Sequence, residues 1–196
     1  AAKGRFGISH FILIDGLNFI FELVGGTRTY LELIENPAEV RKAIDLAFDL
    51  NVLVQNAFFN EDVMVEGGTC SNFAQWVPGR IVSESVDPFH MTSVDTFEEW
   101  GRNPAERIYA HYDGGVLHIH ANGRHLLEAV STLKGLKAIS LQDDVGYPSS
   151  FSVLPELRQK LGDTPLGVQC TFPEIRCALE RRSLTGGVLY SVTGVP

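Results

Sequence analysis

The sequence lacks the features that mark secreted or membrane-spanning proteins. It has three cysteines in 196 residues, an odd and small number that does not make a disulfide framework, so a reducing compartment is the simpler expectation. It has no apolar run long enough to cross a bilayer and no cleavable signal pattern at its start. We therefore expect a cytoplasmic protein without a membrane partner.

Positive charge is also scarce. The chain has 16 lysines and arginines against 24 aspartates and glutamates, a net charge of -8, and no cluster of basic residues. Such a surface repels nucleic acids and anionic membranes, so neither is an expected partner. The glycine-containing stretch "GGTRTY" does not match a phosphate-binding loop, so nothing in the sequence indicates nucleotide use.

The composition is that of an ordinary globular domain. Hydrophobic residues make up 44% of the chain and charged residues 20%, which is enough apolar surface for a substantial core and too little charge for a disordered chain. No residue-level repeat or low-complexity segment divides it. We expect one domain over residues 1–196.

Short apolar runs alternate with segments of helical periodicity. The expected strands are residues 10–15, 62–68, 115–120, 136–142, 165–170 and 186–192, and a helical segment follows each except the last. Alternation of this kind predicts parallel strands joined by helical crossovers, and hence an α/β sheet or barrel. In either architecture the chemistry lies at the carboxyl ends of the strands.

Two connecting regions differ from this simple alternation. Residues 69–92 are the longest irregular stretch, too long for a plain connector, and we interpret them as a binding loop. Residues 93–112 are expected to be helical from Ser93 onward, with a bend at Pro104.

The stretch "GVLHIHANG" carries the clearest chemical pattern. On a strand, His118 and His120 share one face while Leu117 and Ile119 share the other. Two imidazoles side by side suit a metal site that a third ligand from a neighbouring strand completes. The candidates for that third ligand are Asp143, Asp144 and Cys170. Polar substrate contacts without metal and a hydrogen-bonded structural role remain open for the same pair.

Other polar residues fall at expected strand ends or turns. Glu66 precedes Gly67-Gly68 and is a candidate general acid or ligand, with a turn contact as the alternative. Cys170 ends an expected strand and is the cysteine most expected at a site, whereas no neighbouring lysine or arginine favours a reactive Cys70. Asn122, before Gly123, is a candidate helix cap and substrate contact.

These motifs resemble the uroporphyrinogen decarboxylase superfamily. The segment "HFILIDGLNFIFELVGGTRTYLELIENPAEVRKAID" is similar to the superfamily segment in which a strand and a helix ending in Gly-Gly precede a "D-x-x-x-x-P-E-x-V" helix. The segment "GVLHIHANGRHLLEAVSTLKGLKAISLQDD" is similar to its later strand-helix-strand unit. "SESVDPFHMTS" resembles a superfamily loop, which implies that Asp87 and His90 lie over the mouth of the pocket. The resemblance implies a (β/α)8 barrel, of which the six expected strands would be the third to the eighth.

The resemblance also implies a candidate activity. In the corrinoid-linked methyltransferases of this superfamily, a "H-x-C" pair, an acidic residue on the next strand and a late cysteine hold zinc, which activates a thiol towards a methyl-cobalt group. By this resemblance His118 matches the first zinc ligand, His120 replaces the cysteine and Asp143 lies near the acidic position. We expect His118 and His120 to bind zinc, Asp143 to assist as ligand and catalytic group, and Glu66 to contact substrate. Asp87, His90, Asn122 and Cys170 would bind substrate. The late cysteine has no counterpart, since Thr193 stands near its position.

Two alternatives to methyl transfer stay open. One is cofactor-free decarboxylation of a tetrapyrrole carboxylate, although Phe21 and Thr193 stand near positions where the decarboxylases carry a tyrosine and a histidine. The other is a barrel without catalytic activity that binds a tetrapyrrole, a corrinoid or another protein.

The chain is shorter than a full barrel, which usually needs about 250 residues, and six strands leave two unpaired edges. We therefore expect it to be the carboxyl-terminal part of such a barrel. The first strands would come from preceding sequence of a longer protein, from a partner chain or from a second copy.

Overall fold

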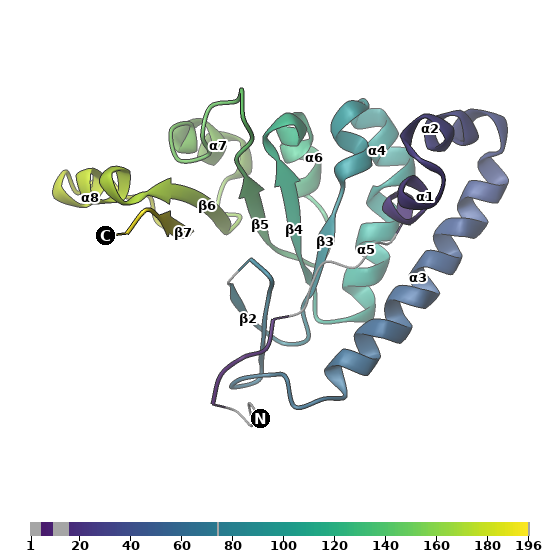
Figure 1. The fold of residues 1–196 in the computed structure, drawn as a ribbon, viewed down its shortest axis with the longest axis horizontal. Coiled ribbons are helices and arrows are strands. Elements are labelled where there is room, and N and C mark those ends of the chain that lie inside the picture. The colour runs from purple at the N-terminus through teal and green to yellow at the C-terminus, as the bar shows by residue number, and fades with distance from the viewer. Residues whose placement is uncertain (1–4, 10–15, 74, 196) are drawn as a thin grey trace.

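A computed structural model describes residues 5–9, 16–73 and 75–195 of the chain and has a mixed α/β fold. A five-stranded parallel sheet is flanked by helices, and a two-stranded hairpin lies beside the sheet (Figure 1). The α/β class and the parallel sheet are confirmed. The strand expected over residues 10–15 lies outside the described residues.

The helices occupy most of the connections between strands. They are α1 (Gly16–Val24), α2 (Gly26–Glu35), α3 (Pro37–Phe59), α4 (Val94–Trp100), α5 (Arg102–His111), α6 (Leu127–Ser131), α7 (Leu154–Leu161), α8 (Phe172–Glu180) and the 3-10 helices η1 (Asp87–Met91) and η2 (Ala121–Leu126). The longest helix, α3, runs along one side of the molecule, and α8 lies at the opposite side (Figure 1). Within the described ranges, no helix combines the length and the apolar character needed to cross a bilayer.

The strands of the parallel sheet lie in chain order. They are β3 (Val82–Ser85), β4 (Gly115–His120), β5 (Leu136–Gln142), β6 (Leu166–Thr171) and β7 (Val188–Thr193). Every neighbouring pair is parallel, so all five carboxyl ends lie at the same edge of the sheet. Sequential parallel order with helical crossovers is compatible with part of an α/β barrel.

The hairpin consists of β1 (Gly68–Cys70) and β2 (Trp76–Pro78) and lies at the amino ends of the parallel strands. Two contacts attach it there: the Ile81 amide, just before β3, donates to Thr69 Oγ1 at 3.0 Å, and the Thr69 hydroxyl donates to the Gly79 carbonyl at 2.6 Å. Phe73, between β1 and β2, packs on the face of the sheet against Ile81, Val116 and Ala138.

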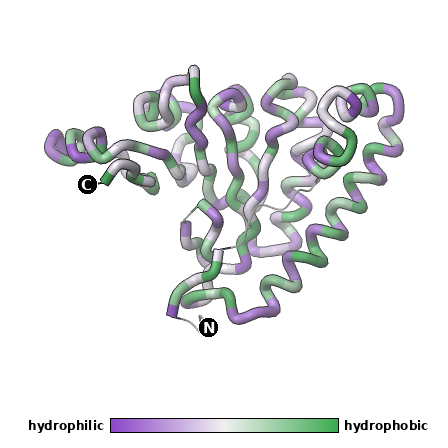
Figure 2. Tube along the Cα trace, viewed as in Figure 1, coloured by the Kyte–Doolittle hydropathy of each residue, from purple (hydrophilic) through white to green (hydrophobic). Residues whose placement is uncertain are grey.

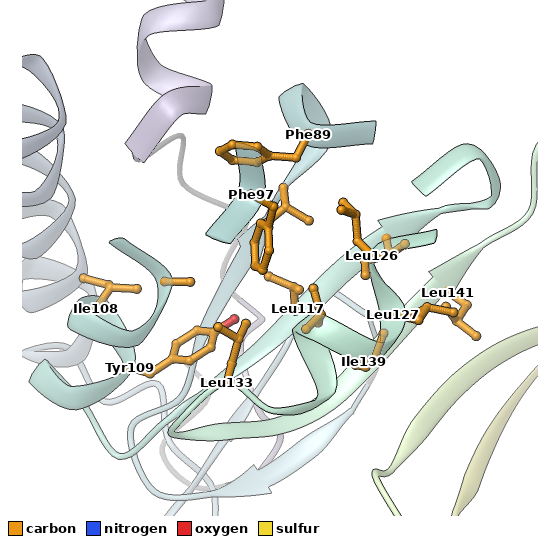
Figure 3. Close-up of a cluster of buried hydrophobic side chains, with 14 of the residues drawn as sticks. Phe89, Phe97, Ile108, Tyr109, Leu117, Leu126, Leu127, Leu133, Ile139 and Leu141 are labelled. Atoms are coloured by element: carbon orange, nitrogen blue, oxygen red, sulfur yellow. The ribbon is translucent and has the colours of Figure 1, made fainter. Parts of the chain in front are cut away.

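One face of the sheet packs against helices and forms the main core. Leu117 and Ile119 of β4, with Ile139 of β5, are fully buried there against α4, α5 and α6 (Figure 3). Hydrophobic and hydrophilic residues alternate along α3 (Figure 2), which packs against α1, α2 and α5. The alternation along β4 therefore directs His118 and His120 to the other face of the sheet.

The helical stretch expected over residues 93–112 begins as predicted but breaks earlier. Ser93 caps α4, because its Oγ accepts a hydrogen bond from the Thr96 amide at 3.2 Å. The break between α4 and α5 falls at Gly101. A Cβ there would lie 2.6 Å from a ring carbon of Phe97, so only glycine permits this packing. Pro104 is the third residue of α5, where the missing amide costs no helical hydrogen bond.

Two sequence-based assignments were wrong. Residues 62–67 form no regular strand, and Gly68 is only the first residue of β1. Val65 and Gly68 form a single bridge around a turn in which Glu66 has φ 50°. The stretch 69–92, interpreted as a binding loop, instead contains β1, β2, β3 and η1. β3 was missed because its sequence, Val-Ser-Glu-Ser, has no apolar run, although three of its four residues are buried.

We predict that Leu117→Ala lowers the free energy of unfolding by about 2–5 kcal/mol, because it removes a fully buried side chain between sheet and helices. Urea denaturation followed by circular dichroism measures the change. The matched control is Leu53→Ala on α3, where the side chain is 67% exposed and the expected cost is about 0.5 kcal/mol or less. Equal losses in the two variants would contradict the assignment of the core face.

Candidate functional site

The two histidines of β4 lie next to each other at the carboxyl end of the sheet. Their ring centroids are 4.7 Å apart and the rings are nearly perpendicular. His120 is the last residue of β4, so its side chain lies where the loops after β3 and β5 meet the sheet. The expectation that both imidazoles share one face is confirmed.

The loop after β5 fixes the orientation of His120. Asp144 Oδ1 lies 2.9 Å from His120 Nδ1, and Asp144 Oδ2 accepts a hydrogen bond from the Ala121 amide at 2.7 Å. Partial burial raises the pKa of Asp144, but the hydrogen bonds from His120 and Ala121 outweigh it and hold that pKa below its ordinary value. With an ionised Asp144 as the acceptor, His120 Nδ1 carries the proton, and in that tautomer Nε2 is left as an electron-pair donor.

His118 is more deeply buried and is enclosed by rings. It is 8% exposed, and Phe73 stacks on it with a centroid distance of 5.0 Å and an interplanar angle of 8°. Burial lowers the pKa of His118, and the neighbouring His120 lowers it further. Its Nδ1 is buried and has no hydrogen-bond partner within the described structure. A neutral imidazole with an unsatisfied nitrogen is a suitable ligand for a cation.

The 3-10 helix η1 brings a carboxylate to the histidine pair. One ligand atom from each of Asp87, His118 and His120 lies within 4.8 Å of the other two. Donor atoms around an ion at 2.0–2.2 Å lie about 3–4 Å apart, so a small contraction of the group would place all three in a first coordination sphere. Two imidazoles and one carboxylate fit a divalent transition metal.

His90, also on η1, packs against His120 and lies near Asp87. Its ring centroid is 5.8 Å from that of His120, and its Nδ1 is 3.7 Å from Asp87 Oδ1. A Cβ at Gly123 would lie 2.2 Å from the His90 ring, so only glycine leaves room for this imidazole. Burial lowers the pKa of His90 to about 4, the nearby Asp87 acting in the opposite direction. His90 is therefore neutral near pH 7 and packs beside the carboxylate as an uncharged ring.

A pocket of about 300 Å³ opens over this group. It is lined by Asp87, His90, Met91, His120, Asn122, Asp144 and Tyr147. The lining contains two carboxylates and, among the described residues, no lysine or arginine. Two carboxylates without a lysine or arginine beside them favour a bound cation and disfavour a carboxylate-rich ligand.

The sequence-based choice of Asp143 as third ligand does not agree with the geometry. Asp143 Oδ1 lies 3.2 Å from Arg124 Nη2 and accepts a hydrogen bond from the Ser150 amide at 2.7 Å. These two partners occupy the Asp143 carboxylate and fix the loop after β5. The acidic group that meets both imidazoles is Asp87, which the resemblance places only over the pocket mouth.

Two other candidate residues lie away from the pocket. Glu66 is exposed in the turn before β1, at the amino end of the sheet, so it does not share the site with His120. Cys170 alternates with Gly167 and Gln169 on β6 and therefore points to the helix-covered face, where it is 4% exposed. Burial raises the pKa of the Cys170 thiol, and the nearby Glu174 adds to that effect. It is a buried thiol rather than a reactive one.

Asp87, His90 and Asn122 do line the pocket as expected. Met91 and Tyr147 also line the pocket and were not predicted from the sequence. The one available signal for Tyr147 was the run "DDVGYP", since Gly146 and Pro148 mark a tight loop directly after a strand. No sequence signal linked Phe73 to His118.

Comparisons of the chain with protein-family models, with curated proteins and with solved structures give no match. The chemistry of the pocket therefore rests on its own geometry. The donor set can hold a divalent cation, and Asn122 and Tyr147 provide polar groups at the opening for a second, organic molecule.

We predict that the metal-free protein loses stability in acid partly through His90. The unfolded chain protonates a histidine near pH 6.5, whereas folded His90 stays neutral down to about 4. The contribution of neutral His90 to the free energy of unfolding is fully present above pH about 6.5. It is lost as the pH falls from there towards 4, because the unfolded state then binds more protons than the folded state. Urea denaturation of His90→Gln at about pH 7 and about pH 5, with chelator present, will show a smaller loss than the parent protein. His125→Gln, at an exposed histidine, is the control; a loss in His90→Gln equal to that of the parent would refute the assignment.

Proposed function

We propose that this chain is an incomplete (β/α)8-type enzyme domain of the uroporphyrinogen decarboxylase superfamily and that it catalyses zinc-dependent methyl transfer to a thiol. The observation that carries the proposal is the convergence of Asp87, His118 and His120 at the carboxyl end of a parallel sheet. Strand ends of this kind are where barrel enzymes hold their reacting groups. The sequential order of the five parallel strands is in keeping with part of such a barrel.

The residues of the pocket have distinct roles in this proposal. His118 and His120 bind the metal ion through imidazole nitrogens, and Asp87 replaces Asp143 as the carboxylate ligand. Asp144 keeps His120 in the tautomer that leaves Nε2 free, and the ion pair of Asp143 with Arg124 holds the loop that carries Asp144. The bound ion would supply the positive charge that lowers the pKa of a thiol substrate.

The pocket charge favours methyl transfer over tetrapyrrole decarboxylation. A substrate with several carboxylates needs cationic partners, and the described lining of the pocket offers Asp87 and Asp144 instead. A thiol gains from a metal ion and needs no arginine. A methyl-corrinoid, when bound, would supply a methyl group to the substrate sulfur: the new carbon–sulfur bond would replace the carbon–cobalt bond, whose electron pair would remain on cobalt, and the thiol proton would pass to solvent.

The surroundings of the pocket suit a large methyl-carrying partner. Met91, Val145 and Tyr147 are 68%, 102% and 51% exposed at or beside its opening. Apolar side chains gathered at a pocket mouth are typical of interaction sites. A corrinoid, free or carried by a protein, would cover this rim and present its methyl group to the pocket.

The edge strand β7 leaves one side of the parallel sheet open for pairing with further strands. Within the described residues β7 pairs only with β6, and its residues are alternately exposed and half-buried. An unpaired parallel edge is covered by further strands in a complete barrel. In this proposal those strands belong to a longer polypeptide, to a partner chain or to a second copy.

We predict that purified protein binds about one zinc ion per chain, and that His118→Ala, His120→Ala and Asp87→Asn each weaken binding at least about tenfold. Isothermal titration with zinc chloride and metal analysis after gentle purification measure this. His125→Ala is the matched control, because its ring nitrogen lies 3.0 Å from the Thr92 carbonyl and outside the group. Circular dichroism confirms that each variant is folded. Less than about one zinc in ten chains for the parent protein would rule the metal centre out.

Asp144→Asn and Asp143→Asn form a second, paired test. We expect Asp144→Asn to weaken zinc binding by about 10–100-fold, because it removes the carboxylate that orients His120. Asp143→Asn should change the affinity less, since Asp143 contacts Arg124 and Ser150 and not an imidazole. The same zinc titration applies, and a larger effect for Asp143→Asn would reverse the assigned roles.

A methyl-transfer assay tests the activity itself. Zinc-loaded protein mixed with methylcobalamin and an alkyl thiol should cause loss of the methylcobalamin spectrum and formation of the thioether. His120→Ala should lower the rate by at least about 100-fold. Full zinc binding without any thioether would leave the metal site in place and remove the methyltransferase assignment.

A further inference from the structure

A second hollow lies beside the candidate metal group, on the face of the sheet opposite the helices. Its volume is about 360 Å³, within the range of small-molecule sites. The residues that matter for its chemistry are Asn72, Phe73, Ser140, Gln142, Gln169 and Ser191. Ile81, Val116 and Ala138, packed under Phe73 and Val77, close the face towards the amino ends of the strands.

The register of the sheet places four polar residues in one row. His120 pairs with Gln142 across β4 and β5, and Gln169 pairs with Ser191 across β6 and β7. The side chains of Gln142 and Gln169 are joined directly, since Gln169 Nε2 donates to Gln142 Oε1 at 3.2 Å. The row therefore crosses four strands, and neighbouring strands are about 4.8 Å apart. It begins at a candidate metal ligand and ends at Ser191.

The amides of this row are held in place and still have capacity for a ligand. Gln142 Nε2 donates to the Asp143 carbonyl at 3.3 Å, and its Oε1 accepts from Gln169, so the Gln142 side chain is fixed at both ends. Gln169 Oε1 and the hydroxyls of Ser140 and Ser191 have no hydrogen-bond partner within the described structure. The amide oxygen can accept hydrogen bonds, and each hydroxyl can both accept and donate them. Neighbouring hydroxyl groups on a ligand would match this pattern.

The lining of this hollow carries no charge. Among its described residues there is no lysine, arginine, aspartate, glutamate or histidine. An anionic or cationic ligand would lose its hydration here without gaining a charged partner, which is costly. An uncharged polar ligand instead exchanges its water contacts for amide and hydroxyl contacts. Phe73 and Leu189 provide apolar contact for the carbon skeleton.

We propose that this hollow binds an uncharged, hydroxyl-rich small molecule of the sugar or polyol class, which lies along Gln142, Gln169 and Ser191. Binding of that molecule requires no metal ion. A further statement rests on the proposed function: the molecule reaches His120 at the end of the row, so the substrate of the metal centre carries hydroxyl groups and not carboxylates.

The test compares sugars of similar size that differ in charge. Glucose, glucuronate and glucosamine are titrated into the full chain at millimolar concentrations, with galactose and myo-inositol as further neutral probes, and binding is followed by ligand-observed NMR. We expect neutral probes to bind and both charged analogues to bind at least about fivefold more weakly, because the lining offers no counter-charge. Failure of every neutral probe, or equal binding of glucuronate, overturns the proposal.

Matched variants locate the site. Gln169→Ala should weaken binding of the neutral probe at least about fivefold, whereas Gln159→Ala, at an exposed glutamine on α7, should leave it unchanged. Equal effects of the two variants overturn the placement along the row. The titrations are repeated with His118→Ala: undiminished glucose binding in a variant that no longer binds zinc supports a separate site. If the parent chain binds glucose but no zinc, the proposed metal chemistry fails and this binding site stands.

Discussion

The structure depends on the alternation of side chains along β4. Leu117 and Ile119 are fixed in the helix-covered core, and burial of both removes any freedom in the strand's register. His118 and His120 are therefore forced onto the opposite face, side by side, whatever they bind. The same constraint runs across the sheet, because parallel neighbours in register present their polar residues on the same face. The polar row from His120 to Ser191 follows from this packing.

Loops then convert a polar face into a site. The residues after β3 bring Asp87, and the residues after β5 bring Asp144, to the end of β4. Two adjacent aspartates have different tasks: Asp143 fixes the loop through Arg124 and Ser150, and Asp144 fixes an imidazole. This division explains how a short loop holds a side chain with the accuracy that ligand geometry demands.

The later strands and the histidine pair could be predicted from sequence, because short apolar runs that alternate with helical segments define β4 to β7 and period-two alternation places both imidazoles on one face. β3 could not be predicted, since two serines and a glutamate give this buried strand no apolar run. Residues 62–68 were predicted as a strand because apolar residues alternate there, but the segment ends in a glycine turn. The choice between Asp143 and Asp144 depends on loop geometry, and the contribution of Asp87 depends on where the missed strand ends. Neither is encoded in local periodicity.

The orientation of His118 depends on the β1–β2 hairpin, which lies at the amino ends of the parallel strands. Trp76 Nε1 donates to the Val65 carbonyl at 2.9 Å, which secures the base of the segment whose tip places Phe73 on His118. The stack of Phe73 on His118 thus connects the hairpin at the amino ends of the parallel strands to the histidine pair near the carboxyl end of β4. A substitution at Trp76, which is remote from the pocket, would weaken the packing of Phe73 on His118 and so leave the His118 ring less well oriented. The position of this imidazole therefore depends on an intact hairpin.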